Sequence, residues 1–109
     1  MSAVRNVQVG HFADNYLVVP AETDEAAILV AKAILGTWLS PNAVLKVVRV
    51  RDYHETVGQH FRGPEGTYAC VAYDWRTGFW MKDVKTGVDR DVSERALGRT
   101  YHRIYEVSS

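Results

Sequence analysis

Two short turns of the same chemistry constrain this chain more than any other feature of its sequence. The tripeptides Arg76-Thr77-Gly78 and Lys85-Thr86-Gly87 each follow a run rich in aromatic or β-branched residues. A three-residue hairpin loop that ends in glycine fits a type I turn with a G1 bulge, because its last residue needs a positive φ angle. The sequence therefore predicts a three-stranded antiparallel meander over residues 68–92.

The positions of the two loops also predict which meander residues share a face of the sheet. Trp75 is expected opposite Phe79, and Tyr73 opposite Met81, so that these four side chains lie on one face. The other face is expected to be the core, because small and β-branched residues fill it evenly. Its members are Cys70, Ala72, Trp80, Val84, Val88 and Val92. An error of one residue in either turn would exchange the faces.

A single long helix is predicted over residues 24–39. Thr23 or Asp24 suits the N-cap position, and an acidic residue there is favourable at the positive end of the helix dipole. Within residues 26–35 the only charged side chain is Lys32, so the helix is apolar nearly all round. Such a helix needs cover on more than one side. One side can lie on the sheet, and loops or a second chain must cover the other, so a homodimer is one expectation.

The remaining elements complete an α+β fold. Strand character is also present in the segments 4–9, 16–19, 44–51 and 99–107. We therefore expect one domain over residues 1–109, with a mostly antiparallel sheet of about five strands and one main helix. The C-terminal order of three strands, a short turn and a strand also occurs in small SH3-like barrels, an analogy of element order alone.

Composition excludes several classes of protein. Lys plus Arg equals Asp plus Glu, 13 each, and a neutral chain is a poor candidate for a nonspecific polyanion binder. Cys70 is the only cysteine, which excludes an intrachain disulfide and a cysteine-based zinc site. The N-terminus lacks an apolar signal segment, and the longest near-apolar run, residues 26–35, is too short to span a bilayer. A cytoplasmic protein without membrane contact is expected.

The sequence contains no arrangement that predicts catalysis or a cofactor. His54 and His60 lie six residues apart, which is roughly 240° around a helix, so they would not share a face as metal ligands. Cys70 falls within a predicted strand, where a free cysteine acts as a small hydrophobe. The carboxylates at positions 83, 89 and 91 match no calcium loop and have basic neighbours. We expect a protein that is not an enzyme and needs neither a metal nor an organic cofactor.

Two functions remain, and they belong to different classes. The leading hypothesis is a non-enzymatic protein-interaction module that acts by steric blocking, as small adaptors and inhibitors do, including those encoded by phages and plasmids. Its partner-binding residues would be those that interface cores favour: Tyr73, Trp75, Arg76, Phe79 and Met81. The same residues could instead form a second core layer. The alternative function is nucleic-acid binding by arginines and aromatic side chains on a sheet, with a basic surface at Arg95, Arg99 and Arg103.

Overall fold

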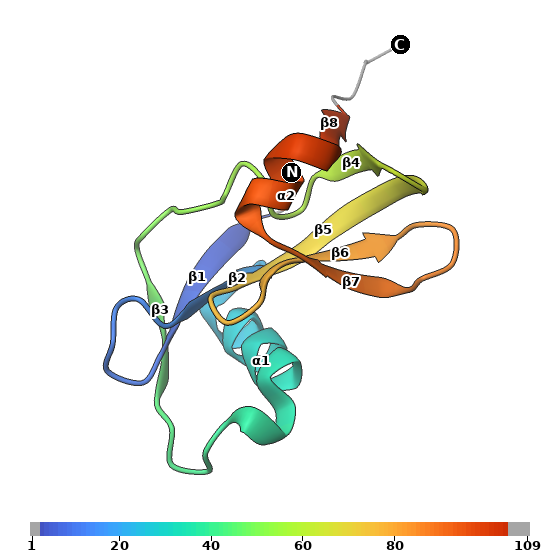
Figure 1. Cartoon of the computed structure of the whole chain (residues 1–109). Coiled ribbons are helices and arrows are strands. Elements are labelled where there is room, and N and C mark those ends of the chain that lie inside the picture. The colour runs from blue at the N-terminus through green and yellow to red at the C-terminus, as the bar shows by residue number, and fades with distance from the viewer. Residues whose placement is uncertain (1–2, 105–109) are drawn as a thin grey trace.

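The protein has an α+β fold, seen in a computed structural model that describes residues 3–104 (Figure 1). Within these residues eight antiparallel strands form one open sheet, and one main helix packs on it. The helical elements are α1 (Asp24–Leu35), the 3-10 helix η1 (Gly36–Trp38) and α2 (Glu94–Thr100). The strands are β1 (Val4–Val9), β2 (Tyr16–Pro20), β3 (Leu45–Val48), β4 (His60–Gly63), β5 (Gly66–Asp74), β6 (Gly78–Asp83), β7 (Asp89–Val92) and β8 (His102–Ile104).

Strand β5 joins the two halves of the sheet. The order along one path is β3-β1-β2-β5-β4-β8, and β6 and β7 continue from β5. β2 pairs with the end of β5 at Tyr73 and Asp74, β4 pairs with residues 66–69, and β6 pairs with residues 68–74. Because a strand has two edges, β2 and β4 share one edge of β5 and β6 takes the other. The long strand thereby links the N-terminal strands to the C-terminal meander.

Two apolar clusters pack on opposite faces of this sheet. On one face α1 covers β1, β2 and β3, with Ala27, Ala31 and Leu35 buried. On the other face Leu97 of α2 and Tyr101 pack with the buried residues of β5, β6 and β7. Figure 1 shows α1 below the sheet and α2 above it. Each face of the sheet therefore has its own helical cover, α1 on one face and α2 on the other.

Helix α1 begins where the sequence predicts. The Thr23 hydroxyl oxygen accepts a hydrogen bond from the Ala26 amide at 3.1 Å, which makes Thr23 the N-cap. The α-helix ends at Leu35 and continues as η1 to Trp38, close to the expected end at residue 39. Leu29 is exposed on its outer side, and cover by a second chain stays a prediction. No helix between residues 3 and 104 is long and apolar enough to cross a membrane.

The expected register of the first hairpin is wrong. Its loop lies one residue earlier than predicted, so that Asp74 pairs with Gly78 and Tyr73 with Phe79. Trp75 therefore leaves the face that it was expected to share with Phe79. A register shift between Cys70 and Ala72 also places these two residues on opposite faces of the sheet, although both were expected in one core layer.

The second hairpin has a loop one residue longer than predicted. The Asp83 amide donates to the Val88 carbonyl at 3.0 Å, and Val92 pairs with Phe79 rather than with Trp80. This register reverses which side chains of β7 lie on each face of the sheet. As a result Val84 and Val88, expected in the core, are exposed, and the core side of the meander is the one that carries Phe79. The error follows from the loop length, because one extra residue inverts every side chain beyond it.

The SH3-like arrangement suggested by element order is not confirmed. The strands lie in one open sheet, and there are more of them than the five expected. The predicted C-terminal strand over residues 99–107 is only partly present, because α2 extends to Thr100 and β8 occupies His102–Ile104. Residues 105–107 of that prediction lie outside the described residues.

The two turn glycines provide a matched stability test. Gly78 and Gly87 both have positive φ angles, 105° and 75°, as the sequence predicted. A Cβ atom on Gly78 would lie 2.6 Å from the Val92 carbonyl oxygen, whereas a Cβ atom on Gly87 would meet nothing within 4 Å. We expect Gly87→Ala to cost about 1–2 kcal/mol of backbone strain and Gly78→Ala to cost clearly more, measured by urea unfolding. Equal losses would contradict the close approach of β6 to β7.

Candidate interaction surface

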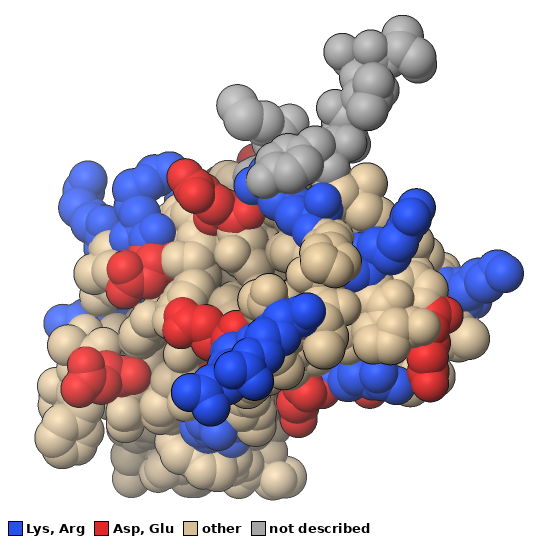
Figure 2. Space-filling view, turned by 45° about the horizontal axis from the view of Figure 1, so that its top comes forward, with Lys and Arg blue, Asp and Glu red and all other residues tan. Residues whose placement is uncertain are grey.

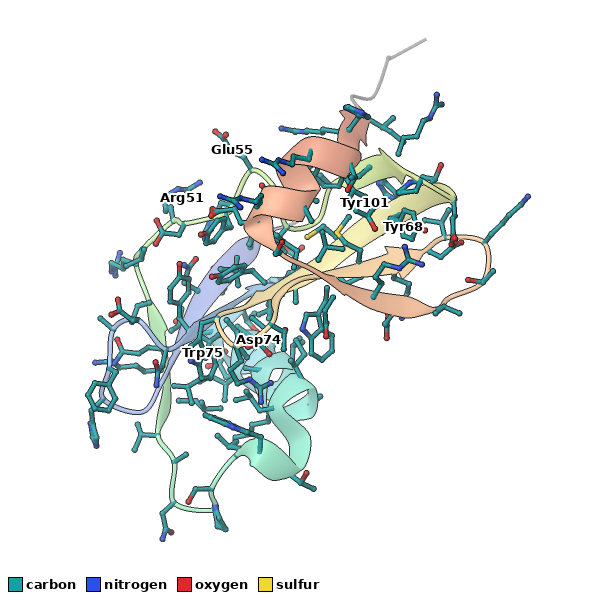
Figure 3. The ribbon with its side chains drawn as sticks, in the orientation of Figure 1. Arg51, Glu55, Tyr68, Asp74, Trp75 and Tyr101 are labelled. Carbon is teal, nitrogen blue, oxygen red and sulfur yellow. The ribbon has the colours of Figure 1, made fainter. Side chains whose placement is uncertain are left out.

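The β5–β6 turn forms a cluster with the end of the main helix. Trp75 and Arg76 lie in this turn, and Trp38 ends η1. The Trp38 and Trp75 rings meet edge to face at 5.3 Å between centroids. The Arg76 guanidinium carbon lies 4.8 Å from the Trp38 ring centroid and 5.4 Å from that of Trp75. We call Trp38, Asp74, Trp75 and Arg76 the tip cluster, and Figure 3 shows Asp74 and Trp75 beside α1.

Asp74 fixes the arginine of the tip cluster. Its carboxylate is fully buried, and it accepts hydrogen bonds from Arg76 Nε at 3.0 Å and from an Arg76 terminal nitrogen at 2.6 Å. The Arg76 backbone amide also donates to this carboxylate, at 2.9 Å. These hydrogen bonds raise the pKa of Arg76, although burial acts in the opposite direction. The guanidinium is therefore charged, paired and held in one orientation.

The predicted partner-binding residues divide between the core and this surface. Phe79 and Met81 are 1% and 0% exposed and belong to the core, so the expectation that they lie on an accessible face is corrected. They are buried because Val92, Leu97 and Tyr101 cover that side of the meander. Trp75 and Arg76 remain half-buried at the turn. A binding role for these residues is untested.

Tyr73 belongs to a separate aromatic group beneath the loop that joins β3 to β4. Its ring stacks on Tyr53 at 4.2 Å and lies 5.6 Å from Tyr16. Tyr53 donates a hydrogen bond to Glu94 at 3.1 Å, and Tyr16 donates to Asp52 at 3.4 Å. Burial, followed by the neighbouring Tyr73 and Asp52, raises the pKa of Tyr16 to about 12. Burial, followed by the hydrogen bond to Glu94, raises the pKa of Tyr53. These tyrosines are hydrogen-bond donors, and they pin the loop to the sheet.

Sequence reasoning missed Trp38 and misjudged Trp80. Trp38 is 53% exposed, although the sequence predicts it only as part of the apolar helix over residues 24–39, which needs cover. A large aromatic residue after a helix-ending glycine was the available signal. Trp80, expected in the core, is half-buried against the α1 cluster, and its indole nitrogen donates to the Thr77 hydroxyl at 3.0 Å.

The three arginines predicted to form the alternative basic surface lie on α2 and β8. Arg95, Arg99 and Arg103 are all exposed. Arg95 and Arg99 lie one helical turn apart on α2. Figure 2 shows, however, that basic side chains on this side of the molecule are interspersed with acidic ones. The surface is mixed in charge rather than uniformly basic.

The candidate catalytic and metal-binding residues are not arranged as a site. Cys70 is buried, and this burial raises the pKa of its thiol to about 12, so the reactive thiolate is strongly disfavoured. Within residues 3–104 no group of three His, Cys, Asp or Glu side chains is placed to hold a metal ion. His54 instead lies against Asn6, with its Nε2 at the Asn6 side-chain oxygen. The absence of catalysis and of a cofactor stays a prediction.

His54 makes the stability of the fold depend on pH. Its burial, and then the positive charge of Arg51, lower its pKa below the usual 6.5. The unfolded chain therefore binds this proton more readily than the folded protein does, and His54 favours unfolding once the pH falls below that value. We expect the free energy of unfolding to decline as the pH falls below about 6.5, the value of the unfolded chain. His54→Gln should remove part of this dependence, whereas the exposed His102→Gln should not, and an unchanged slope in both would refute the assignment.

In comparisons with known proteins, the chain matches no protein-family model, no curated protein and no solved structure.

Proposed function

We propose that the chain is a non-enzymatic protein-interaction module that acts as a small adaptor or inhibitor by steric blocking. The observation that carries this proposal is the exposed Trp38 ring held against a fixed Trp75 and Arg76. Tryptophan and arginine are the residues most enriched among interface hot spots. A cytoplasmic location, and an origin on a phage or plasmid, would suit such a module.

The tip cluster suits binding because most of its side chains are already ordered before a partner makes contact. Ordering a side chain at an interface costs about 0.5–1.5 kcal/mol. Arg76 is already oriented by Asp74, and Trp38 is already packed edge to face on Trp75. A partner that meets this surface would therefore lose less binding energy to side-chain ordering. The proposed contact residues are Trp38, Trp75 and Arg76, and the core residues Phe79 and Met81 would act only by supporting the turn.

Truncation of Trp38 tests this surface. We expect Trp38→Ala to fold normally and to weaken binding to a partner isolated from the native host by about 2 kcal/mol, or about thirtyfold. Binding of the isolated partner is measured by calorimetry. The matched control is Phe12→Ala, another exposed aromatic, which lies between β1 and β2. Equal affinity of the wild type and Trp38→Ala would exclude the tip cluster as the interface.

A homodimer is a special case of the same proposal. The outer side of α1 carries the exposed Leu29, and a second chain could cover it. Light scattering at micromolar concentration measures the mass directly. A dimer that Leu29→Ala converts to monomer would make α1 the interface, whereas a monodisperse wild-type monomer would exclude it.

Nucleic-acid binding is the second candidate. The exposed arginines of α2, together with Arg103 on β8, support it. Salt separates the two functions, because phosphate contacts weaken steeply as salt rises and aromatic-anchored protein contacts do not. A binding reaction that persists at high salt and depends on Trp38 would favour the protein-interaction function.

A further inference from the structure

A cleft lies between the start of α1 and the chain that leaves strand β3. Its volume is about 620 Å³, within the range of small-molecule sites. The side chains that matter here are Arg5, Asp24, Arg49, Arg51 and His54, and valines supply an apolar wall. The tip cluster is not part of this cleft.

The charge of the cleft is positive and incompletely paired. Arg5 lies 3.3 Å from Asp24 and also donates to the Glu22 carbonyl at 2.9 Å. Arg49 and Arg51 are exposed, and neither makes an ion pair or a hydrogen bond with the part of the chain that the structure describes. Three arginines against one aspartate leave a surplus of two positive charges, 3 − 1 = +2. Two guanidinium groups are thus available to a ligand.

The wall that carries these arginines is held in place before any ligand arrives. Tyr53 follows Arg51 by two residues and has a φ angle of 61°, the only positive φ among the described residues other than glycine. Such a conformation is costly for a bulky side chain, and here the stack on Tyr73 and the hydrogen bond to Glu94 maintain it. On the next residue, His54 is fixed by its contact with Asn6. The loop beside the cleft therefore has a defined conformation.

A second observation beside this wall is an orphaned polar group. The Asn6 side chain is fully buried, and its amide nitrogen has no hydrogen-bond partner in the structure of residues 3–104. Buried donors are nearly always paired, and the exceptions often mark a functional site. Its neighbour His54 lines the cleft. The cleft thus presents two unpaired arginines beside a loop that the Tyr53 stack and the contact between Asn6 and His54 hold in place.

We propose that this cleft binds a small phosphorylated ligand, with Arg49 and Arg51 contacting its phosphate groups. A guanidinium presents a planar fork of donors that matches phosphate oxygens, and a doubly charged anion balances the surplus of the cleft. A nucleic-acid strand fits less well. The same loop carries Asp52 and Glu55 next to Arg51, and these carboxylates would repel a phosphodiester backbone that continued beyond the cleft. Figure 3 shows Arg51 and Glu55 together at this outer edge of the molecule.

Inorganic pyrophosphate is the probe that tests the proposal. Calorimetric titration of the full chain at low ionic strength should show saturable binding at one site per chain. The double variant Arg49→Gln/Arg51→Gln should weaken this binding by about tenfold or more, because charge-assisted contacts are lost. The control is Arg62→Gln/Lys85→Gln, which removes the same charge from exposed positions outside the cleft and should bind like the wild type. Both pairs are exposed, and thermal melting verifies that both variants fold.

Three outcomes would overturn the proposal. The first is the absence of saturable pyrophosphate binding by the wild type. The second is an equal loss in the Arg62→Gln/Lys85→Gln control, which would show that binding follows net charge rather than the cleft. The third is tighter binding of a single-stranded oligonucleotide that depends on Arg95 and Arg99, which would assign anion recognition to nucleic acid on the other surface. None of these results bears on Trp38, so the cleft and the interaction surface stand or fall separately.

Discussion

Replacement of Asp74 by asparagine is expected to lower the free energy of unfolding by about 3–5 kcal/mol. The Asp74 carboxylate is 0% exposed and bonds to Arg76 through both of its oxygens. Asparagine keeps the shape and one acceptor oxygen, but it removes the charge that neutralises the guanidinium. Arg76 would then lie between Trp38 and Trp75 without its counterion. Breaking such a pair costs more than the pair contributes, because the Arg76 side chain, only 23% exposed, stays largely desolvated and loses its counterion.

An exposed ion pair in the neighbouring β6–β7 hairpin provides the control. Lys82 and Asp89 lie 3.8 Å apart with about half of each side chain exposed. Asp89→Asn removes the same functional group, and it should change stability by less than about 1 kcal/mol because solvent screens the pair. Urea unfolding curves of the two variants measure the difference directly. Similar small losses in both would show that water reaches the Asp74 carboxylate, and the fixed geometry of the tip cluster would then be wrong.

Phe79→Ala is expected to cost about 3–5 kcal/mol of stability, the usual range for a fully buried phenylalanine. The ring is 1% exposed, with centroids 5.2 Å from those of Tyr53 and of Tyr73. Its removal leaves a cavity between β6 and the β3–β4 loop and releases two edge-to-face contacts. Loss of the Phe79 ring should also loosen Tyr53, whose left-handed backbone conformation is otherwise held by the stack on Tyr73 and the hydrogen bond to Glu94.

The matched variant is Phe12→Ala, because the same atoms are removed from a ring that is 70% exposed. It should shift stability by no more than about 0.5 kcal/mol. Near-ultraviolet circular dichroism would report the aromatic packing alongside the unfolding curve. A Phe79→Ala protein with wild-type stability would mean that Phe79 faces outward, and the register of the β5–β6 hairpin would have to be reassigned.

The sequence alone was sufficient for the local features of this fold. Thr23 caps α1, and Gly78 and Gly87 adopt positive φ angles, each because of a requirement within a few residues. The type of element follows from such requirements, so the main helix, the meander and the α+β class could be predicted. Ser93 caps α2 in the same local way, because its hydroxyl oxygen accepts a hydrogen bond from the Ala96 amide.

Tertiary structure decided which side of each strand is buried. The loop after Asp74 could close at either of two neighbouring pairs of residues, and nothing within the tripeptide distinguishes them. Burial of Asp74 opposite Gly78, and the fit of Gly78 against Val92, select one. The shift between Cys70 and Ala72 likewise depends on neighbours distant in the chain, because β2 and β4 must both pair with β5. Side chains alternate between the two faces of a strand. Each such choice of pairing therefore exchanges the buried and exposed sides of every residue beyond it.

The two candidate sites are also products of the tertiary structure. Trp38 meets Arg76 across 38 positions of sequence, and Arg5 meets the cleft with Arg49 and Arg51 only because β1 pairs with β3. Such neighbours leave no periodic signal in a single sequence, because each pairing depends on the packing of a whole sheet. The sequence by itself determined the elements, the neutral charge and the supply of aromatic and arginine side chains. The grouping of these side chains into sites was set by the pairing of strands that are distant in the sequence. This pairing is favoured because apolar area is buried only when distant strands and helices pack together.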